Sequence, residues 1–174
     1  MKKQFTLSVL LIGILCSTSL LAQEKEDKSK RPSPPAKAEG TADGAKIVID
    51  YSKPSAKGRK MLGGVEPFGK VWRTGANEAT TFEVDKNVKI EGKELAKGKY
   101  ALFTIPGETE WTIIFNKTAN QWGAYEYKEA EDALRVTVKP GKTDKFVETL
   151  NIAVEGNKIV IRWENTQVAF AVKG

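Results

Sequence analysis

Residues 99–115 read KYALFTIPGETEWTIIF, two short apolar segments joined by a turn. Pro106 and Gly107 end the first segment, because proline cannot donate a ladder hydrogen bond and glycine favours turns. In the second segment Trp111, Ile113 and Phe115 are two residues apart, so they lie on one face of an extended strand. The stretch therefore predicts two neighbouring strands.

The same alternation continues on both sides of this stretch. Further strands are predicted at residues 46–51, 80–84, 87–90, 93–95, 134–138, 150–154, 159–163 and 168–172. One short helical turn is expected at 128–133, and no long amphipathic helices alternate with the strands. The pattern predicts an all-β fold, an antiparallel β-sandwich of about nine short strands, with a partly closed barrel as the alternative.

Residues 1–22 have the order of a secretory signal peptide. Two lysines precede an apolar run at 5–15, and small residues lead to Ala22. The run is shorter than the roughly 20 residues that span a bilayer, so no transmembrane segment is expected in the mature protein. Cleavage is predicted after Ala22, with Ser19 as the alternative, and the protein is expected to be periplasmic or secreted.

Cys16 leaves a second mode of export open. A lipoprotein needs a small residue directly before its lipidated cysteine, and Leu15 occupies that position. Cys16 also lies among apolar residues, so we expect it to be removed with the signal. The mature protein would then contain neither a thiol nor a disulfide.

Residues 23–41 are dense in charge and proline, including Pro32, Pro34 and Pro35. Such a segment cannot bury enough apolar area to offset its ordering entropy. We predict a disordered tether at 23–41 and a single β-sandwich domain at 42–174.

The net charge of +6 is not concentrated in the domain. Residues 41–174 hold 21 basic and 18 acidic side chains, a balance of +3, and the two signs are interleaved. Nucleic-acid binders normally gather Lys and Arg on one face. The sequence therefore argues against a nucleic-acid partner.

Residue types also exclude several chemistries. The chain has no histidine, which removes the Ser-His-Asp triad and His-ligated metals. Without a mature cysteine there is no thiol nucleophile. No catalytic residue, metal site or cofactor is predicted. The chemistries that remain are carboxylate chemistry, Ser or Thr with Lys, and hard-cation sites built from oxygen.

Two long irregular segments, 53–77 and 116–125, are where a site is expected. The candidate ligand-binding residues are Arg59, Arg73, Asn77, Glu78 and Trp122. The arginines could hold an anionic or polar group, the amide and carboxylate could orient it, and the indole could stack on a sugar. The structural alternatives are an Arg73–Glu78 ion pair that holds the loop, and an indole that only anchors its loop. Trp111 and Trp163, in phase with aliphatic residues, are predicted to be core.

Several motifs resemble the bacterial domain of unknown function 2911 family. They are YSKP (51–54), GRK (58–60), VWRTGANEAT (71–80), LFTIP (102–106) and NQWG (120–123), spread over most of 51–174. The resemblance implies an exported bacterial β-domain and supplies no activity and no catalytic residues.

Taken together, the residues predict a non-catalytic module of the bacterial envelope that binds a small polar ligand, a glycan or an envelope protein. One alternative is a carboxylate-dependent glycan hydrolase with Glu78 as an acid or base. The other is a structural envelope protein.

Overall fold

The computed structural model describes residues 26–174, so the predicted signal peptide lies outside the described part of the chain. The prediction of an all-β fold is confirmed. Residues 26–174 form ten strands in two antiparallel sheets, which do not close into a barrel. The short turn expected at 128–133 is the 3-10 turn Glu129–Glu131.

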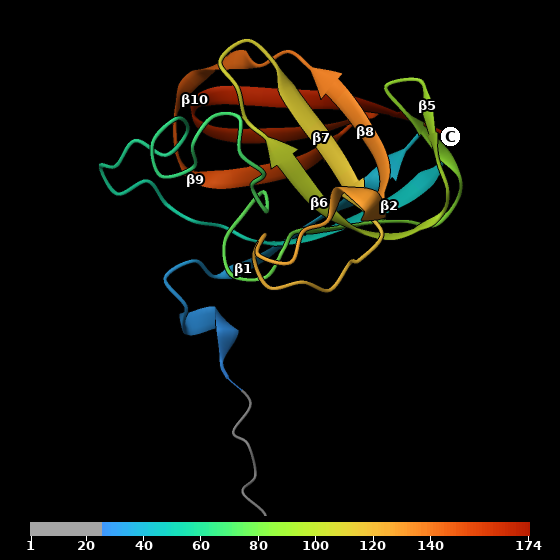
Figure 1. The fold of residues 1–174 in the computed structure, drawn as a ribbon. Coiled ribbons are helices and arrows are strands. Elements are labelled where there is room, and N and C mark those ends of the chain that lie inside the picture. The colour runs from blue at the N-terminus through green and yellow to red at the C-terminus, as the bar shows by residue number, and fades with distance from the viewer. Residues whose placement is uncertain (1–25) are drawn as a thin grey trace, which may run out of the picture.

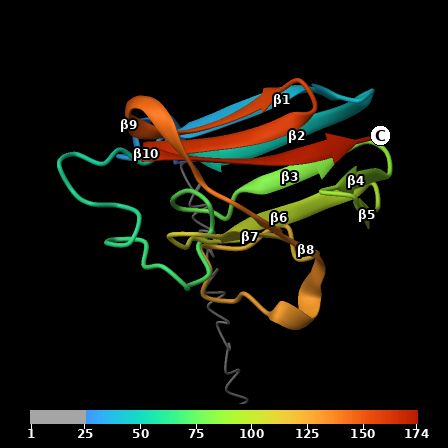
Figure 2. The ribbon, with the colours of Figure 1, turned by 90° about the horizontal axis from the view of Figure 1, so that it is seen from above.

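The two sheets lie face to face. The six-stranded sheet has the order β1-β2-β3-β6-β7-β8. Its strands are Pro35–Ala42 (β1), Ala45–Ser52 (β2), Thr81–Val84 (β3), Gly98–Ile105 (β6), Trp111–Asn116 (β7) and Asp132–Val138 (β8). The second sheet has the order β5-β4-β10-β9, with Lys93–Leu95 (β5), Val88–Ile90 (β4), Lys158–Lys173 (β10) and Gly141–Glu155 (β9). β9 and β10 cross behind β7 and β8 in Figure 1, and Figure 2 shows the molecule from above.

Aromatic side chains from both sheets fill the core between them. Phe115 of β7 meets Phe82 of β3 at 5.0 Å and Phe170 of β10 at 5.8 Å, both in edge-to-face contact. Trp111 and Trp163 are 2% and 1% exposed, which confirms that they are core residues. Alternation along the strands therefore places the residues as their spacing predicts.

The outer face of β6 and β7 is buried as well. Phe103 and Ile114 point away from the main core and form a second apolar cluster. The connection between β7 and β8, residues 117–131, covers them, and the Tyr127 ring lies 5.1 Å from that of Phe103. This connection carries Trp122, so burial of the outer face fixes the position of a candidate site residue.

β1 corrects the predicted tether at 23–41. Residues 35–42 pair with β2 over eight residue pairs, from Pro35 opposite Ser52 to Ala42 opposite Ala45. β1 is an edge strand that buries only Ala38 and Ala42, and the rest of its side chains are partly or fully exposed. Its polar composition reflects that position, so the prediction of disorder is wrong for residues 35–41.

The C-terminal hairpin is longer than predicted. β10 is one continuous strand where the sequence predicts two, and β9 begins well before residue 150. The register shifts on both sides of Glu164, a bulge residue with φ of 53°. The bulge bends the strand without ending it.

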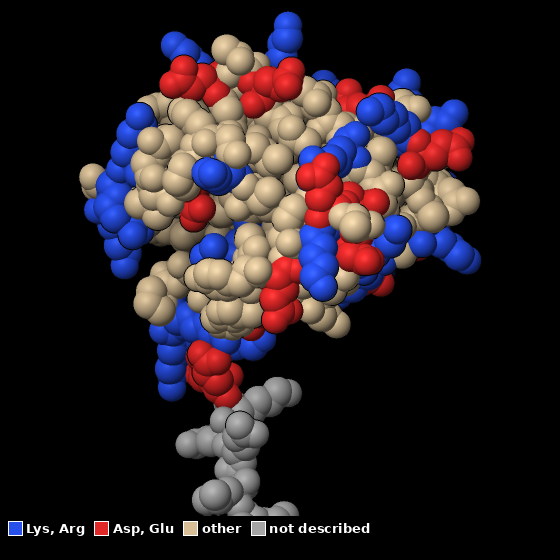
Figure 3. All heavy atoms as spheres, in the orientation of Figure 1, with Lys and Arg blue, Asp and Glu red and all other residues tan. Residues whose placement is uncertain are grey.

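The described surface carries mixed charge. Basic and acidic side chains alternate over the face shown in Figure 3. Within residues 26–174, no helix has the length and apolar character needed to cross a membrane.

Candidate ligand-binding site

Trp72 anchors the segment that leads to the site. It pairs with Thr104 of β6 through two backbone hydrogen bonds, of 2.7 and 2.9 Å. Its ring stacks on Trp163 at 5.6 Å, and its indole N–H donates to the Gly75 carbonyl at 3.0 Å. Trp72 is only 2% exposed, so it holds residues 70–80 on the core and is not available to a ligand.

The two irregular segments meet beside the sheet. Glu78 and Trp122 form an antiparallel bridge. The Gly123 amide donates to the Asn77 carbonyl at 3.1 Å. The structure therefore brings together three of the five predicted site residues, Asn77, Glu78 and Trp122.

The segment before β1 completes this cluster. Arg31 binds the Glu78 carboxylate at 2.7 Å and lies over the Trp122 ring at 5.8 Å, within the range of a cation–π contact. The Asn77 amide donates to the Ser33 carbonyl at 3.0 Å, from a backbone with φ of 58° that asparagine tolerates better than most residues. The site is thus built from three separate parts of the chain.

The carboxylate of Glu78 is held by two cations. Lys28 lies 2.7 Å from one oxygen and Arg31 lies 2.7 Å from the other. Burial opposes ionisation, but hydrogen bonds from Lys28 and Arg31 outweigh it and lower the pKa of Glu78 to about 2. Glu78 is therefore ionised at neutral pH and unsuited to donate a proton.

The predicted arginines lie elsewhere. Arg59 is exposed and donates to two carbonyl oxygens of its own loop, at 3.0 Å each. Arg73 forms no ion pair with Glu78 within residues 26–174, so the predicted Arg73–Glu78 pair is wrong. Burial raises the pKa of Glu66, and the positive charge of Arg73 opposes that rise.

Lys28 and Arg31 are the charged site residues that sequence reasoning missed. Both lie in the segment interpreted as a disordered tether, and nothing local distinguishes them from the other charged residues there. Their common partner, Glu78, is 50 positions from Lys28 and 47 from Arg31. Only the position of Arg31 four residues before β1, once that strand is recognised, could have drawn attention to it.

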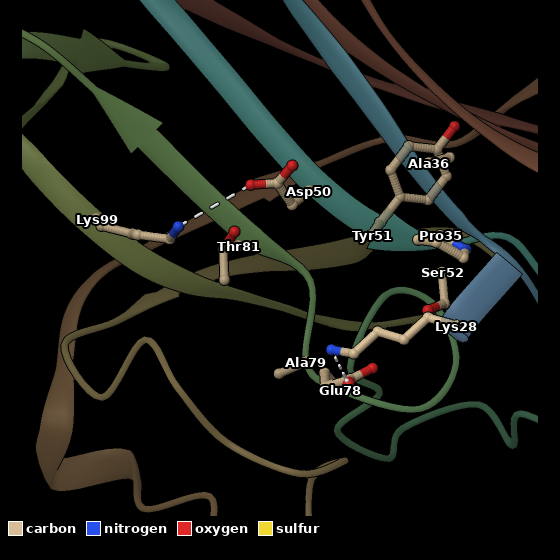
Figure 4. Close-up of a pocket in the computed structure, with 10 residues that line it drawn as sticks. All are labelled: Lys28, Pro35, Ala36, Asp50, Tyr51, Ser52, Glu78, Ala79, Thr81 and Lys99. Atoms are coloured by element: carbon tan, nitrogen blue, oxygen red, sulfur yellow. Dashed lines mark hydrogen bonds and ion pairs between the residues drawn. The ribbon is translucent and has the colours of Figure 1, made fainter. Parts of the chain in front are cut away.

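Two adjoining pockets flank Glu78. The first, of about 210 Å³, is the one in Figure 4, where the Lys28–Glu78 pair lies toward one end and the Asp50–Lys99 pair, with Thr81 beside it, toward the other. The second, of about 230 Å³, lies on the Trp122 side. It is lined by Glu78, Ala79, Thr81, Ala119, Asn120, Gln121 and Trp122. Because Glu78, Ala79 and Thr81 line both, the two pockets form one continuous surface.

Two polar atoms of these lining residues have no hydrogen-bond partner among residues 26–174. They are Oγ1 of Thr81 and Oε1 of Gln121, both buried. The amide orientation of Gln121 is well determined, because its nitrogen donates to the Asn116 side chain at 3.1 Å and to the Thr118 carbonyl at 2.6 Å. An unsatisfied buried acceptor costs about 1–3 kcal/mol, so both atoms favour a partner with hydroxyl or amine donors.

A polar cluster holds the Trp122 connection in place. Asp132 is central: it accepts from Asn116 at 2.8 Å, from the Tyr127 hydroxyl at 2.6 Å and from Arg135 at 2.6 Å. Burial, followed by the hydrogen bond to Asp132, raises the pKa of Tyr127 to about 12. Tyr127 therefore stays protonated as a donor, and hydrogen bonds to Asp132 hold the chain on both sides of Trp122, at Asn116 and at Tyr127.

The described residues of the cluster are arranged for polar contacts and not for metal coordination. Within 26–174, no group of three or more Asp, Glu, His or Cys side chains is arranged to hold a metal ion. What the cluster offers is an indole that is 56% exposed, free acceptor atoms and an ionised carboxylate already paired with cations. This arrangement suits recognition of a polar molecule better than proton transfer.

Comparison with known proteins gives a family but no activity. Searches of the curated proteins and of the solved structures found no match. A family model described as protein of unknown function (DUF2911) matches residues 33–172. The match includes both irregular segments and all the strands except the last residue of β10, and Lys28 and Arg31 precede it. The chain therefore belongs to the DUF2911 family of proteins of unknown function.

Proposed function

We propose that the domain is a non-catalytic binding module that takes a hydroxyl-rich ligand, of the saccharide class, beside Trp122. The observation that carries this proposal is the pair of buried, unpartnered oxygens of Thr81 and Gln121 next to an exposed indole. Sugar hydroxyls supply the missing donors, and the C–H face of a sugar ring packs on an indole.

The electrostatics of Glu78 favour binding over hydrolysis. A glycoside hydrolase needs one carboxyl group that is protonated at the working pH. The ion pairs with Lys28 and Arg31 keep Glu78 ionised and occupy both of its oxygens. In the binding model Glu78 holds the N-terminal segment against Trp122 and accepts, at most, one ligand hydroxyl at its edge.

Calorimetric titration of the protein with a panel of neutral and acidic oligosaccharides tests the proposal. At least one panel member should bind, and Trp122→Ala should weaken that binding at least tenfold. Thr81→Val, which removes the hydroxyl with little change in shape, should weaken it several-fold.

Phe146→Ala is the matched control, because Phe146 is 54% exposed on β9 and lines neither pocket. It should leave the affinity unchanged. If no oligosaccharide of the panel binds, or if Trp122→Ala does not weaken the binding, the proposed site is refuted.

We also propose that the protein acts outside the cytoplasm, in the periplasm or as a secreted protein, on the basis of the signal peptide predicted at residues 1–22. Mass spectrometry of the mature protein from a secreting bacterial host tests this. Cleavage after Ala22 or Ser19 supports export with a cleaved signal peptide. A mature protein that begins at a lipid-modified Cys16 would instead support the lipoprotein alternative.

A further inference from the structure

A third pocket, of about 420 Å³, lies apart from the Trp122 site. It is formed by the loop that follows β2, the connection before β7, the start of β9 and the bulged part of β10. None of its lining residues lines the two pockets beside Glu78. Its volume falls in the range of small-molecule sites.

The indole N–H of Trp111 lacks an acceptor in this region. Trp111 lines the pocket and is only 2% exposed, and its Nε1 has no hydrogen-bond partner within residues 26–174. The other two core indoles are satisfied: Trp72 donates to Gly75 and Trp163 donates to Glu148. A buried donor left unpaired costs about 1–3 kcal/mol, so this one favours a ligand with an acceptor oxygen.

The charged side chains of the pocket carry a net charge of +1. Lys60 and Lys142 line it, both are exposed, and neither forms an ion pair in the described part of the chain. Glu108 lines it as well and contributes the one negative charge. Two lysines minus one glutamate match a ligand with a single negative charge better than a multiply charged one.

One wall of the pocket is apolar and fixed. Leu62 and Phe68 contribute apolar side chains. The carboxylate of Glu164 accepts from the backbone amides of Met61 and Leu62, at 2.9 Å each, which ties the loop to the bulge of β10. The wall therefore exists before any ligand arrives, which lowers the entropic cost of binding.

We propose that this pocket binds a small organic monocarboxylate with an apolar body. The carboxylate accepts a hydrogen bond from the Trp111 indole and pairs with Lys60 and Lys142, while the apolar body packs on Phe68 and Leu62. Glu108 disfavours doubly charged anions. The proposal is independent of the Trp122 site, since the two regions share no residue.

Nuclear magnetic resonance of the ¹⁵N-labelled protein tests this, with benzoate and butyrate as probes at constant ionic strength. The chain has four tryptophans, hence four indole signals, and Trp111→Phe assigns the one of interest. Benzoate should shift the Trp111 indole signal saturably and leave that of Trp122 in place. Benzamide, which has the same shape without the charge, and inorganic phosphate should shift it at least tenfold less at equal concentration.

The lysine variants keep the test decisive even if Trp111→Phe does not fold. The double variant Lys60→Gln/Lys142→Gln should weaken benzoate binding at least tenfold, whereas Lys158→Gln, an exposed lysine at the start of β10 outside the pocket, should not. No saturable shift with either carboxylate, an equal response to benzamide, or affinity that the double variant leaves unchanged would each overturn the proposal.

Discussion

Glu78 links three parts of the chain through its backbone and its carboxylate. It bridges to Trp122 through the backbone and pairs with Lys28 and Arg31 through its carboxylate. The N-terminal segment therefore depends on a charge that can be removed by acid. A pH titration separates this contribution from the backbone bridge, which acid does not affect.

Acid should weaken this link in a defined window. Because the pKa of Glu78 falls from its ordinary 4.5 to about 2 on folding, its stabilising contribution is complete above about pH 5 and is lost as the pH falls through 4.5 toward 2. The difference in unfolding free energy between wild type and Glu78→Gln should be constant at neutral pH and shrink below pH 4.5. Urea unfolding at several pH values measures it. The same substitution in a Lys28→Gln/Arg31→Gln background should show no such window, and an identical window there would contradict the assignment.

Asp132 holds the connection that carries Trp122. Its side chain is 7% exposed and accepts hydrogen bonds from Asn116, Tyr127 and Arg135. Asp132→Ala removes the acceptor that these three donors share and leaves the Tyr127 hydroxyl without one, although Asn116 also donates to the Lys128 carbonyl. It should lower the unfolding free energy by about 2–3 kcal/mol in urea unfolding. Glu129→Ala is the control: it removes one exposed pair with Arg135 and should cost less than about 1 kcal/mol. Equal costs for the two variants would mean that the cluster is not what holds the connection.

At the scale of the element, β1 packs closely against the second sheet. A Cβ added at Gly40 would lie 2.9 Å from the Cβ and Cγ1 atoms of Val154 on β9. Gly40→Ala should therefore destabilise the protein by about 1–3 kcal/mol through overpacking. Gly141→Ala is matched to it, since the nearest atom there is 3.7 Å away, an ordinary contact. Thermal unfolding of both variants measures the difference, and a Gly40→Ala protein as stable as wild type would show that β1 shifts freely.

The strands that the sequence predicts correctly are those whose own side chains are buried. Residues such as Trp111, Ile113 and Phe115 alternate because every second one faces the core. β1 lacks this signal, because an edge strand can be held by its ladder to β2 with only two buried alanines. The bulge at Glu164 could not be predicted from the sequence either, because the residues around it have the polar composition of a turn.

Only part of the candidate site could be predicted from the sequence, for a related reason. Asn77 and Trp122 belong to the two irregular segments that the sequence singles out, and Glu78 directly follows the first of them. The pairing of Glu78 with Trp122 is nevertheless a contact across 44 residues of chain. Arg31 is placed by β1, so missing the strand means missing the arginine. The spacing of residues along the chain does not show which distant strands pair. The absence of a residue type, by contrast, can be seen directly in the sequence, and so can the chemistry that it excludes.

At the scale of the whole molecule, the domain begins before residue 42. A chain that starts at residue 34 keeps β1, whereas one that starts at residue 43 loses its ladder to β2 and its contact with β9. The loss of roughly 3 kcal/mol or more should lower the melting temperature of the shorter chain by about 10 °C. Differential scanning calorimetry compares the two. The chain that starts at 34 loses the pairs of Lys28 and Arg31 with the partly exposed Glu78, a small cost, so it should melt within a few degrees of the full protein. Equal melting temperatures for both truncations would show that β1 is dispensable.

β1 also separates the site from the C-terminal end. Pro35 lines the pocket beside Glu78, and the Gly174 amide binds the Asp43 side chain, just beyond the other end of the strand, at 3.0 Å. The seven steps from the first to the last of the eight residues of β1 span about 24 Å, at roughly 3.4 Å each. Orientation on a solid support therefore decides what the protein can capture. Immobilised through its C-terminus it presents Trp122 to the solution, and immobilised at Glu26, which pairs with the Arg31 that lies over the Trp122 ring, it turns Trp122 toward the support.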